Sequence, residues 1–349
     1  MRNTIKNSIL FFTLICCIVS CSNTLYKRSN GIKKSVSLKK SYKDDFYIGA
    51  AIGERQFLEK DVQSTSILKR EFNSISPENS LKWMYLQPEP NVFYFDIADK
   101  YVEFGMRNNM HIVGHTLVWH SQLADFMNKV KDSSVMVKHM QNHINTVVTQ
   151  YKGKIKTWDV LNEALNEDGT LRESIFLNVI GESYIEQAFK LAEKADPNAE
   201  LLYNDYNLCK PKKRAGVVSL VKQLKESGAR IDGIGLQAHW NLKGPSLKEI
   251  EKSIIAYSDL GVKVSFTELD ISVLPNPWEL VGAEVSQNFD EYIGDEKMNP
   301  YPSKLPDSVQ NQLAERYESI FKLFLKHKDK IDRVTFWGIS DRHSWLNNF

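Results

Sequence analysis

Two short segments of this chain each carry a glutamate at the end of a run of strand-forming residues. Residues 158–164 contain Glu163 and residues 264–270 contain Glu268, and both segments hold β-branched and aromatic side chains. Such a run is typical of a buried strand whose last residue emerges at the edge of a sheet. The two carboxylates could therefore share one catalytic pocket. The alternative for each glutamate is a salt-bridged or exposed residue at a strand edge.

Polar and aromatic side chains also gather after other predicted strands, in residues 77–83, 114–122, 203–207, 235–240 and 336–341. This mixture suits sugar recognition, because tryptophan faces pack on pyranose C–H surfaces while amide, histidine and lysine groups hydrogen-bond the hydroxyls. A metal site built from His115, His120 and His239 is the competing interpretation. It is less favoured, because no two of these three histidines have the spacing of one helix face and no cysteine joins them.

The elements that must position these side chains alternate between strand-like and helix-like patterns. We expect eight strands, near residues 46–51, 72–76, 111–116, 156–161, 199–203, 233–236, 263–267 and 333–337. We expect seven helices, near residues 55–70, 97–108, 134–152, 182–195, 211–227, 246–260 and 308–329. This alternation predicts a parallel sheet with helical crossovers. In a parallel α/β barrel, the chemistry lies at the C-terminal ends of the strands, where both glutamates are expected.

The length and composition fit one such barrel. The chain has 349 residues, which suits a barrel of about 250 residues with insertions. Hydrophobic content is 42% and charged content 25%, as in soluble globular proteins, and the formal charge of +2 gives no reason to expect nucleic acid. The longest connection, residues 272–306, is rich in proline and is expected to be a functional loop. It carries Trp278 and Tyr292, to which no motif gives a role.

The N-terminal residues predict export. Residues 1–20 have a basic opening, an apolar stretch and a small residue before Cys21, which is the layout of a secretory signal peptide. Residues 18–21 resemble the lipobox of bacterial lipoproteins, whose cysteine is acylated, and the alternative is ordinary cleavage that leaves a free Cys21. Residues 21–41 then form a lipidated, flexible tether, and the catalytic domain spans residues 42–349. We therefore expect a lipid anchor in the outer membrane, on its periplasmic or cell-surface face.

Six stretches of the chain, in order and spacing, resemble the family 10 glycoside hydrolases, the endo-β-1,4-xylanases. They are residues 78–83, 114–120, 158–164, 204–206, 235–239 and 267–270, and the resemblance runs from about Phe46 to the last residue. It implies a (β/α)8 TIM barrel and a retaining hydrolase of xylan and xylo-oligosaccharides, without metal or cofactor. Glu163 would be the acid/base and Glu268 the nucleophile. Retention fits this pair if the carboxyl groups lie about 5–5.5 Å apart.

The resemblance also implies a role for each remaining site residue. Asn162 would bond the 2-hydroxyl of the sugar at the cleaved linkage, while His239 and Asp270 would hold and ionise Glu268. The pocket of that sugar would be lined by Lys82, His115, Trp119, Gln237 and His239. The next sugar on the non-reducing side would be held by Glu78, Asn79 and Gln122. Trp337 and Trp345 would roof the site, and Tyr206 would stack on the leaving-group side.

One departure from the family concerns the end of the barrel. Family members continue past the eighth strand into a closing helix, whereas this sequence ends at Phe349, so we expect a barrel that lacks its last helix. The outward residues Val334 and Phe336 would then border an uncovered apolar groove between strands eight and one. The segment around residues 32–42 could fold back and cover part of this groove.

The sequence thus predicts a lipid-anchored, monomeric endo-β-1,4-xylanase of a Gram-negative bacterium, with no nucleic-acid partner. Two other functions stay open. One is a surface lipoprotein that binds glycans without cleaving them, although the two glutamates favour an enzyme. The other is an enzyme that acts chiefly on cellulose or mixed glucans, which differ from xylan by one hydroxymethyl group per sugar. Because such a group supplies only about 1–3 kcal/mol of discrimination, side activities are expected.

Overall fold

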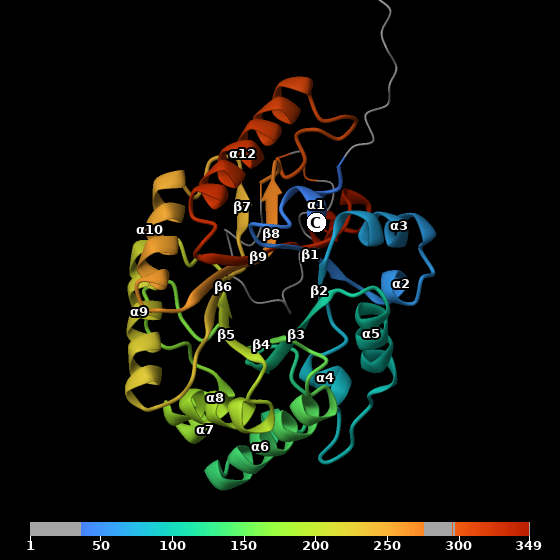
Figure 1. Cartoon of the computed structure of the whole chain (residues 1–349). Coiled ribbons are helices and arrows are strands. Elements are labelled where there is room, and N and C mark those ends of the chain that lie inside the picture. The colour runs from blue at the N-terminus through green and yellow to red at the C-terminus, as the bar shows by residue number, and fades with distance from the viewer. Residues whose placement is uncertain (1–35, 276–294, 296, 349) are drawn as a thin grey trace, which may run out of the picture. The chain divides into compact units, whose positions relative to one another are not determined.

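The computed structural model describes residues 36–275, 295 and 297–348 of the chain. Eight parallel strands form the barrel: β1 (Tyr47–Ile52), β2 (Ser74–Pro77), β3 (His111–Trp119), β4 (Thr157–Asn162), β5 (Glu200–Asp205), β6 (Gly233–Leu236), β8 (Lys263–Ser272) and β9 (Ile331–Phe336). Their order in the sheet is β6-β5-β4-β3-β2-β1-β9-β8, and a further pairing of β6 with β8 closes the ring. The predicted (β/α)8 barrel is confirmed (Figure 1).

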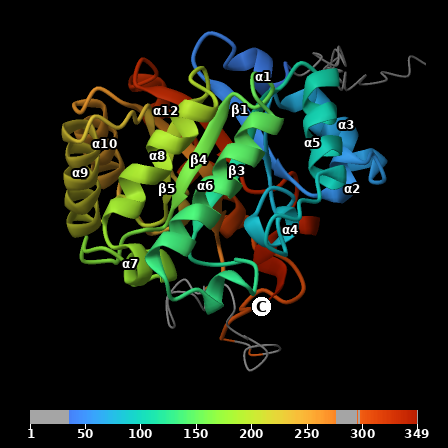
Figure 2. The same cartoon turned by 90° about the horizontal axis from the view of Figure 1, so that it is seen from below.

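Helices surround the strands (Figure 1). The α-helices are α1 (Leu38–Ser41), α2 (Glu54–Phe57), α3 (Val62–Glu71), α4 (Trp83–Leu86), α5 (Asp96–Arg107), α6 (Ser133–Gln150), α7 (Ile175–Ile180), α8 (Ser183–Ala195), α9 (Pro211–Glu226), α10 (Leu247–Ser258) and α12 (Asp307–Lys326). The 3-10 helices are η1 (Met127–Lys129), η3 (Asp341–His343) and η4 (Trp345–Asn348). Figure 2 shows α4 and α7 at one end of the barrel and α1 at the other.

Several elements differ from the sequence prediction, among them the short helices α1, α4 and α7, which were not expected. The single helix expected over residues 55–70 is divided into α2 and α3, because Glu59 adopts a left-handed conformation (φ 58°) and Asp61 caps a new helix by accepting a bond from the Ser64 amide. A ninth strand, β7 (His239–Asn241), was not expected, and it pairs in parallel with the far end of β8. It matters for function because it begins at His239.

Close packing between β3 and β4 fixes the position of the strand that leads to Glu163. Gly114 lies opposite Trp158, whose side chain is fully buried. A Cβ atom at Gly114 would lie 2.1 Å from the indole ring, so only glycine leaves room for Trp158 at this position. The register of β4 against β3 is therefore set a few residues before the strand end that carries the glutamate.

The outer surface between β9 and β1 is packed with aromatic side chains. Val334 is fully buried, and Phe336 stacks on Phe321 of α12 with ring centroids 6.1 Å apart. The Tyr42 ring stacks on the Phe46 ring with centroids 5.1 Å apart, and its centroid lies 5.4 Å from that of Phe321. Among the described residues after β9, only η3 and η4 are helical. Residues that precede β1 thus cover part of the groove that the sequence predicts to be open.

No helix within the described residues is long and apolar enough to cross a membrane.

Candidate active site

Glu163 follows the last residue of β4, as the sequence predicts. Glu268 lies within β8, which extends further than expected, to Ser272. Both side chains are buried, with exposed fractions of 6% and 5%. Glu163 follows β4 directly and has a left-handed backbone (φ 56°), which a non-glycine residue seldom adopts. Its amide is bound to the Asn204 carbonyl at 2.9 Å, so the start of this turn is fixed to the neighbouring strand.

Three side chains donate hydrogen bonds to the carboxyl group of Glu163. The indole Nε1 of Trp119 donates to Oε2 at 3.0 Å. The amides of Gln237 and Asn162 donate to Oε1 at 2.9 Å and 3.2 Å. These donors come from the ends of β3, β4 and β6, so three strands together set the direction of the carboxyl group.

Glu268 is held on the opposite side of the site by His239. The imidazole Nε2 lies 3.2 Å from Oε2 of Glu268, and Nδ1 lies 2.9 Å from Oδ2 of Asp270. Burial lowers the pKa of His239, but the two carboxylates outweigh it and raise this pKa to about 10. Burial raises the pKa of Glu268, but the His239 hydrogen bond and charge hold it below the ordinary glutamate value. Glu268 is therefore ionised, as a nucleophile must be.

A pair of amides connects the two glutamates. Asn204 donates to Oε1 of Glu268 and to Oδ1 of Asn162, both at 2.9 Å, and Asn162 in turn reaches Glu163. The Thr267 hydroxyl donates to Oδ1 of the Asn204 side chain at 2.6 Å. Both the nitrogen and the oxygen of this side-chain amide are therefore bonded. Residues 204–206 form one of the motifs in the sequence, but a role could be predicted there only for Tyr206. The position of Asn204, directly before Asp205 at the end of a buried strand, is the signal that could have identified it.

Lys82 forms a second polar cluster beside Trp119. Its ammonium group donates to Asn79 at 3.0 Å and to Gln122 at 2.6 Å, and it lies 5.1 Å from the centre of the Trp119 ring. Burial lowers the pKa of Lys82 to about 8, although nearby Glu268, Glu163 and Glu78 oppose this change. Burial also raises the pKa of Glu78 above its ordinary value. Lys82, predicted beside one sugar, thus contacts both Trp119 of the same predicted group and Asn79 and Gln122, predicted beside the next sugar.

Trp337 and Trp345, the two tryptophans predicted to roof the site, contact histidine rings. Trp337 makes edge contacts with His115 and His239, with ring centroids 5.8 Å and 6.4 Å apart. His115 is buried and bonded through Nδ1 to Asp159 at 2.9 Å, a partner that the sequence analysis did not name. Trp345 lies 5.1 Å from the His239 ring and donates from Nε1 to Oδ2 of Asp270 at 2.8 Å. Trp345 therefore belongs to the group that holds Glu268, as well as to the roof.

Tyr206 contacts two cations, Arg172 and Lys213. The ammonium of Lys213 lies 3.6 Å from the centre of the Tyr206 ring, and it is paired with Asp205 at 2.8 Å. Arg172 donates to the Tyr206 hydroxyl and, at 2.9 Å, to the backbone carbonyl of Glu163. Neither Arg172 nor Lys213 was expected from the sequence, because both come from segments outside the strand-end motifs.

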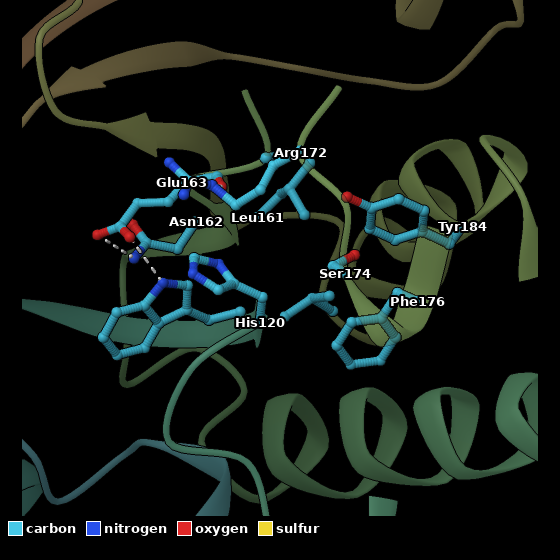
Figure 3. Close-up of a pocket in the computed structure, with 11 residues that line it drawn as sticks. His120, Leu161, Asn162, Glu163, Arg172, Ser174, Phe176 and Tyr184 are labelled. Carbon is cyan, nitrogen blue, oxygen red and sulfur yellow. Dashed lines mark hydrogen bonds between the residues drawn. The ribbon is translucent and has the colours of Figure 1, made fainter. Parts of the chain in front are cut away.

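A small pocket adjoins Glu163. Figure 3 shows Glu163 and Asn162 at one side of it with Arg172 next to Glu163, and Ser174 and Tyr184 at the other side. The cavity also reaches apolar side chains such as Phe176, so it extends behind the turn that carries the glutamate.

Three predicted residues lie outside the described part of the chain: Trp278, Tyr292 and Cys21. Within the described ranges, no group of three or more His, Cys, Asp or Glu side chains is arranged to hold a metal ion.

The arrangement is suited to displacement at a sugar carbon. One carboxylate is kept ionised by a cation, and a second carboxyl group, connected to it through Asn204 and Asn162, can transfer a proton. Tryptophan rings, amides and a lysine surround the pair with the groups that bind sugar faces and hydroxyls.

Comparison with known proteins gives a consistent assignment. The sequence profile described as Glycosyl hydrolase family 10 matches residues 37–349. The endo-1,4-beta-xylanase A of Xylanibacter ruminicola is 42% identical over 309 residues, which cover 87% of this chain and 83% of that protein. The endo-1,4-beta-xylanase of Geobacillus stearothermophilus is 42% identical over 325 residues, covering 90% of each chain. A solved structure described as a novel GH10 endoxylanase from a sugarcane soil metagenome has a TM-score of 0.83 and 42% identity, covering 90% of this chain and 91% of that one.

Proposed function

This chain belongs to glycosyl hydrolase family 10, and on that basis we propose that it is an endo-1,4-β-xylanase that works with retention of configuration. Glu268 attacks the anomeric carbon of the bound xylosyl unit while Glu163 gives a proton to the leaving oxygen. Water then attacks the anomeric carbon while Glu163 removes a proton from it, and the bond between that carbon and Glu268 breaks as the new C–O bond forms. Each step inverts the anomeric carbon, so two steps together retain the β configuration.

The observation that carries this proposal is the unequal surroundings of the two carboxyl groups. The pKa of Glu268 is held low by the His239 hydrogen bond and charge against the effect of burial, so Glu268 is available as a nucleophile. Glu163 has only neutral donors on its carboxyl oxygens, namely an indole and two amides. A carboxyl group in such surroundings can exchange a proton with the substrate without first breaking an ion pair.

The surrounding side chains support a division of the cleft. We assign the cluster of Lys82, Asn79 and Gln122 to the sugars on the non-reducing side of the cleaved bond. We assign the Tyr206 ring to the leaving-group side, because Arg172 joins its hydroxyl to the backbone of Glu163, which protonates the leaving oxygen. Asn162 is already bonded to Glu163 and sits between the two glutamates, where a sugar 2-hydroxyl would meet it.

The roles of the two glutamates can be separated with aryl xylobiosides. Glu268→Ala is expected to abolish hydrolysis of both phenyl and 2,4-dinitrophenyl β-xylobioside, because both need the nucleophile. Glu163→Ala is expected to lose activity on the phenyl compound but to react with the dinitrophenyl compound, whose leaving group needs no proton. Azide should then speed turnover by Glu163→Ala and yield a β-xylosyl azide. Equal losses on both substrates, with no effect of azide, would mean that the two roles are wrongly assigned.

The substrate assignment is tested with xylohexaose and cellohexaose. We expect rapid internal cleavage of xylohexaose and much slower cleavage of cellohexaose, because the relatives named above are called endo-1,4-beta-xylanases. The same comparison on xylan and carboxymethyl cellulose measures side activity on glucans. If the protein binds xylohexaose but releases no products, it is a glycan-binding protein and the proposal fails.

A further inference from the structure

We propose that Arg172 is a positioning residue for the acid/base, because it fixes the turn that carries Glu163 and joins that turn to Tyr206. The inference rests on the proposed function, since it assigns Arg172 to the proton-transfer half of that mechanism. Arg172 is not placed among the groups that touch the reacting atoms. Its expected effect is on where the Glu163 carboxyl group lies.

The backbone at Glu163 needs external support. Its φ of 56° lies in the left-handed region, which costs free energy for a residue with a side chain. Such a conformation persists when the surrounding contacts determine it, and here it aims the carboxyl group toward Trp119 and Gln237. A turn that relaxed to an ordinary conformation would carry the carboxyl group away from the leaving oxygen.

Two contacts hold the main-chain polar groups of Glu163, and Arg172 supplies one of them. The Glu163 amide donates to the Asn204 carbonyl at 2.9 Å, which fixes the residue to the barrel wall. The Glu163 carbonyl accepts from Nε of Arg172 at 2.9 Å. Because Glu163 is 6% exposed, removal of the guanidinium leaves this carbonyl without a charged donor in a largely dry place.

The chain between the two residues is folded so that Arg172 returns beside Glu163. Leu165 and Leu171 form an antiparallel bridge, and the Asn166 amide donates to the Thr170 carbonyl at 2.8 Å. The Arg172 amide then donates to the Ala164 carbonyl at 2.7 Å. A second guanidinium nitrogen, Nη2, reaches the Leu165 carbonyl at 3.2 Å. One side chain therefore binds the main chain on both sides of Ala164.

The same nitrogen connects this turn to the leaving-group side. Nη2 of Arg172 also donates to the Tyr206 hydroxyl, and the Tyr206 ring rests on the ammonium of Lys213. Lys213 is fully buried and paired with Asp205 at the end of β5. Tyr206 is thus fixed by two cations, and its hydroxyl is bonded to the residue that fixes the acid/base.

Arg172 lines the same small pocket as Glu163 and Ala164, and Figure 3 shows Arg172 next to Glu163. The guanidinium therefore lies close enough to the acid/base for its loss to change where the Glu163 carboxyl group lies.

The test compares two leaving groups in Arg172→Gln and Arg172→Lys. We expect kcat/KM for phenyl β-xylobioside to fall by roughly 100-fold in Arg172→Gln, because misplacing a catalytic group by about 1 Å has an effect of this size. For 2,4-dinitrophenyl β-xylobioside we expect a change within about threefold, because this leaving group draws little from general acid catalysis. Arg172→Lys keeps one donor and should lie between Arg172→Gln and the unaltered protein. Neither substrate has a leaving-group sugar, so a direct contact of Arg172 with that sugar cannot produce the difference.

Arg214→Gln is the matched control. Arg214 also donates to backbone carbonyls, those of Cys209 and Glu249, and also binds the Glu249 carboxylate, but it lies on α9 away from Glu163. Its replacement should leave the ratio of the two kcat/KM values unchanged. A purely structural role for Arg172 would lower both substrates equally, and that result, or no loss on either, overturns the inference.

Glu163→Ala, measured beside these variants, separates the two levels of the argument. If Glu163→Ala shows the leaving-group difference and Arg172→Gln does not, only the role of Arg172 is wrong. If Glu163→Ala itself shows no difference, the acid/base assignment fails and the role of Arg172 fails with it.

Discussion

The side-chain amide of Asn204 donates a hydrogen bond of 2.9 Å to the carboxylate of Glu268. The same amide donates to Asn162, which donates to Glu163, so Glu268 and Glu163 share one line of hydrogen bonds. Asn204 is fully buried. A Cβ atom at Gly235 would lie 2.4 Å from Oδ1 of the Asn204 side chain, so only glycine leaves space for this oxygen. The two carboxyl groups are therefore positioned relative to each other and not only by their own strands.

Asn204→Ala tests the importance of this connection. A hydrogen bond to a charged group contributes about 1.5–3 kcal/mol, so we expect kcat/KM on xylohexaose to fall by roughly 10- to 100-fold. Loss of the amide also leaves Thr267 and Asn162 short of a partner, so the free energy of unfolding should fall by about 1–3 kcal/mol. Asn178→Ala on the exposed face of α7 is the control. Activity that is equal in the two variants would show that the connection has no catalytic role.

His239→Asn is expected to change the pH dependence of activity in one direction. Glu268 must be ionised to attack, and its pKa is lowered by the His239 hydrogen bond and charge against the opposing effect of burial. Without His239 the pKa of Glu268 rises. The acidic limb of the profile of kcat/KM against pH therefore moves to higher pH. Profiles with 2,4-dinitrophenyl β-xylobioside report this limb most directly, because that substrate depends little on the acid.

The matched control for this change is His327→Asn. His327 is paired with Glu251, and Glu251 lies on α10 outside the strand-end site. Its replacement should leave the acidic limb where it is. An acidic limb that stays in place in His239→Asn, or that moves to lower pH, would contradict the role given to His239.

The buried pair of Lys213 and Asp205 is expected to matter for stability. Both side chains are fully buried, and removal of one partner leaves an uncompensated charge. Lys213→Met should lower the free energy of unfolding by about 3–5 kcal/mol, measured by urea denaturation. Lys210→Met is the control, because Lys210 pairs with a carboxylate, that of Glu167, but is exposed. Its loss should change the free energy of unfolding by less than about 1 kcal/mol. Similar losses in the two variants would show that burial of the pair does not set its contribution.

The sequence predicts the barrel and its glutamates well because both are local patterns. A buried strand and an amphipathic helix can each be recognised from a few adjacent residues, and so can Glu163 at the end of a strand. The eight predicted strands all occur, with ends shifted by a few residues. The division of residues 55–70 into α2 and α3 was missed, because it depends on the left-handed Glu59 and on the cap formed by Asp61.

The contacts between distant segments were not predictable in this way. Asn204 and Glu268 are 64 residues apart, and Gln237 and Glu163 are 74 apart. Arg172 comes from a loop whose fold depends on its own hydrogen bonds, and nothing in the residues around it indicates that it returns to Glu163. Lys213 lies on α9, which carries several lysines and an arginine. The sequence does not indicate which of these side chains is buried.

We propose, from residues 18–21, that Cys21 carries a lipid and holds the mature protein on a membrane. In Triton X-114 partition, the protein expressed with its full N-terminus should enter the detergent phase, because acyl chains bury apolar CH₂ groups there. Cys21→Ser should enter the aqueous phase. If both forms partition alike, the cysteine is not acylated, and ordinary cleavage of the signal peptide with a free Cys21 is the remaining interpretation.

The stereochemistry of the first product tests the central assignment most directly. Proton NMR of a xylohexaose digest, recorded before mutarotation, distinguishes the α and β anomers at the newly formed reducing end. A double displacement with Glu268 as nucleophile and Glu163 as acid/base predicts that the β anomer appears first and the α anomer follows by mutarotation. An α anomer that appears first would show single displacement by water, and the covalent role of Glu268 would be wrong.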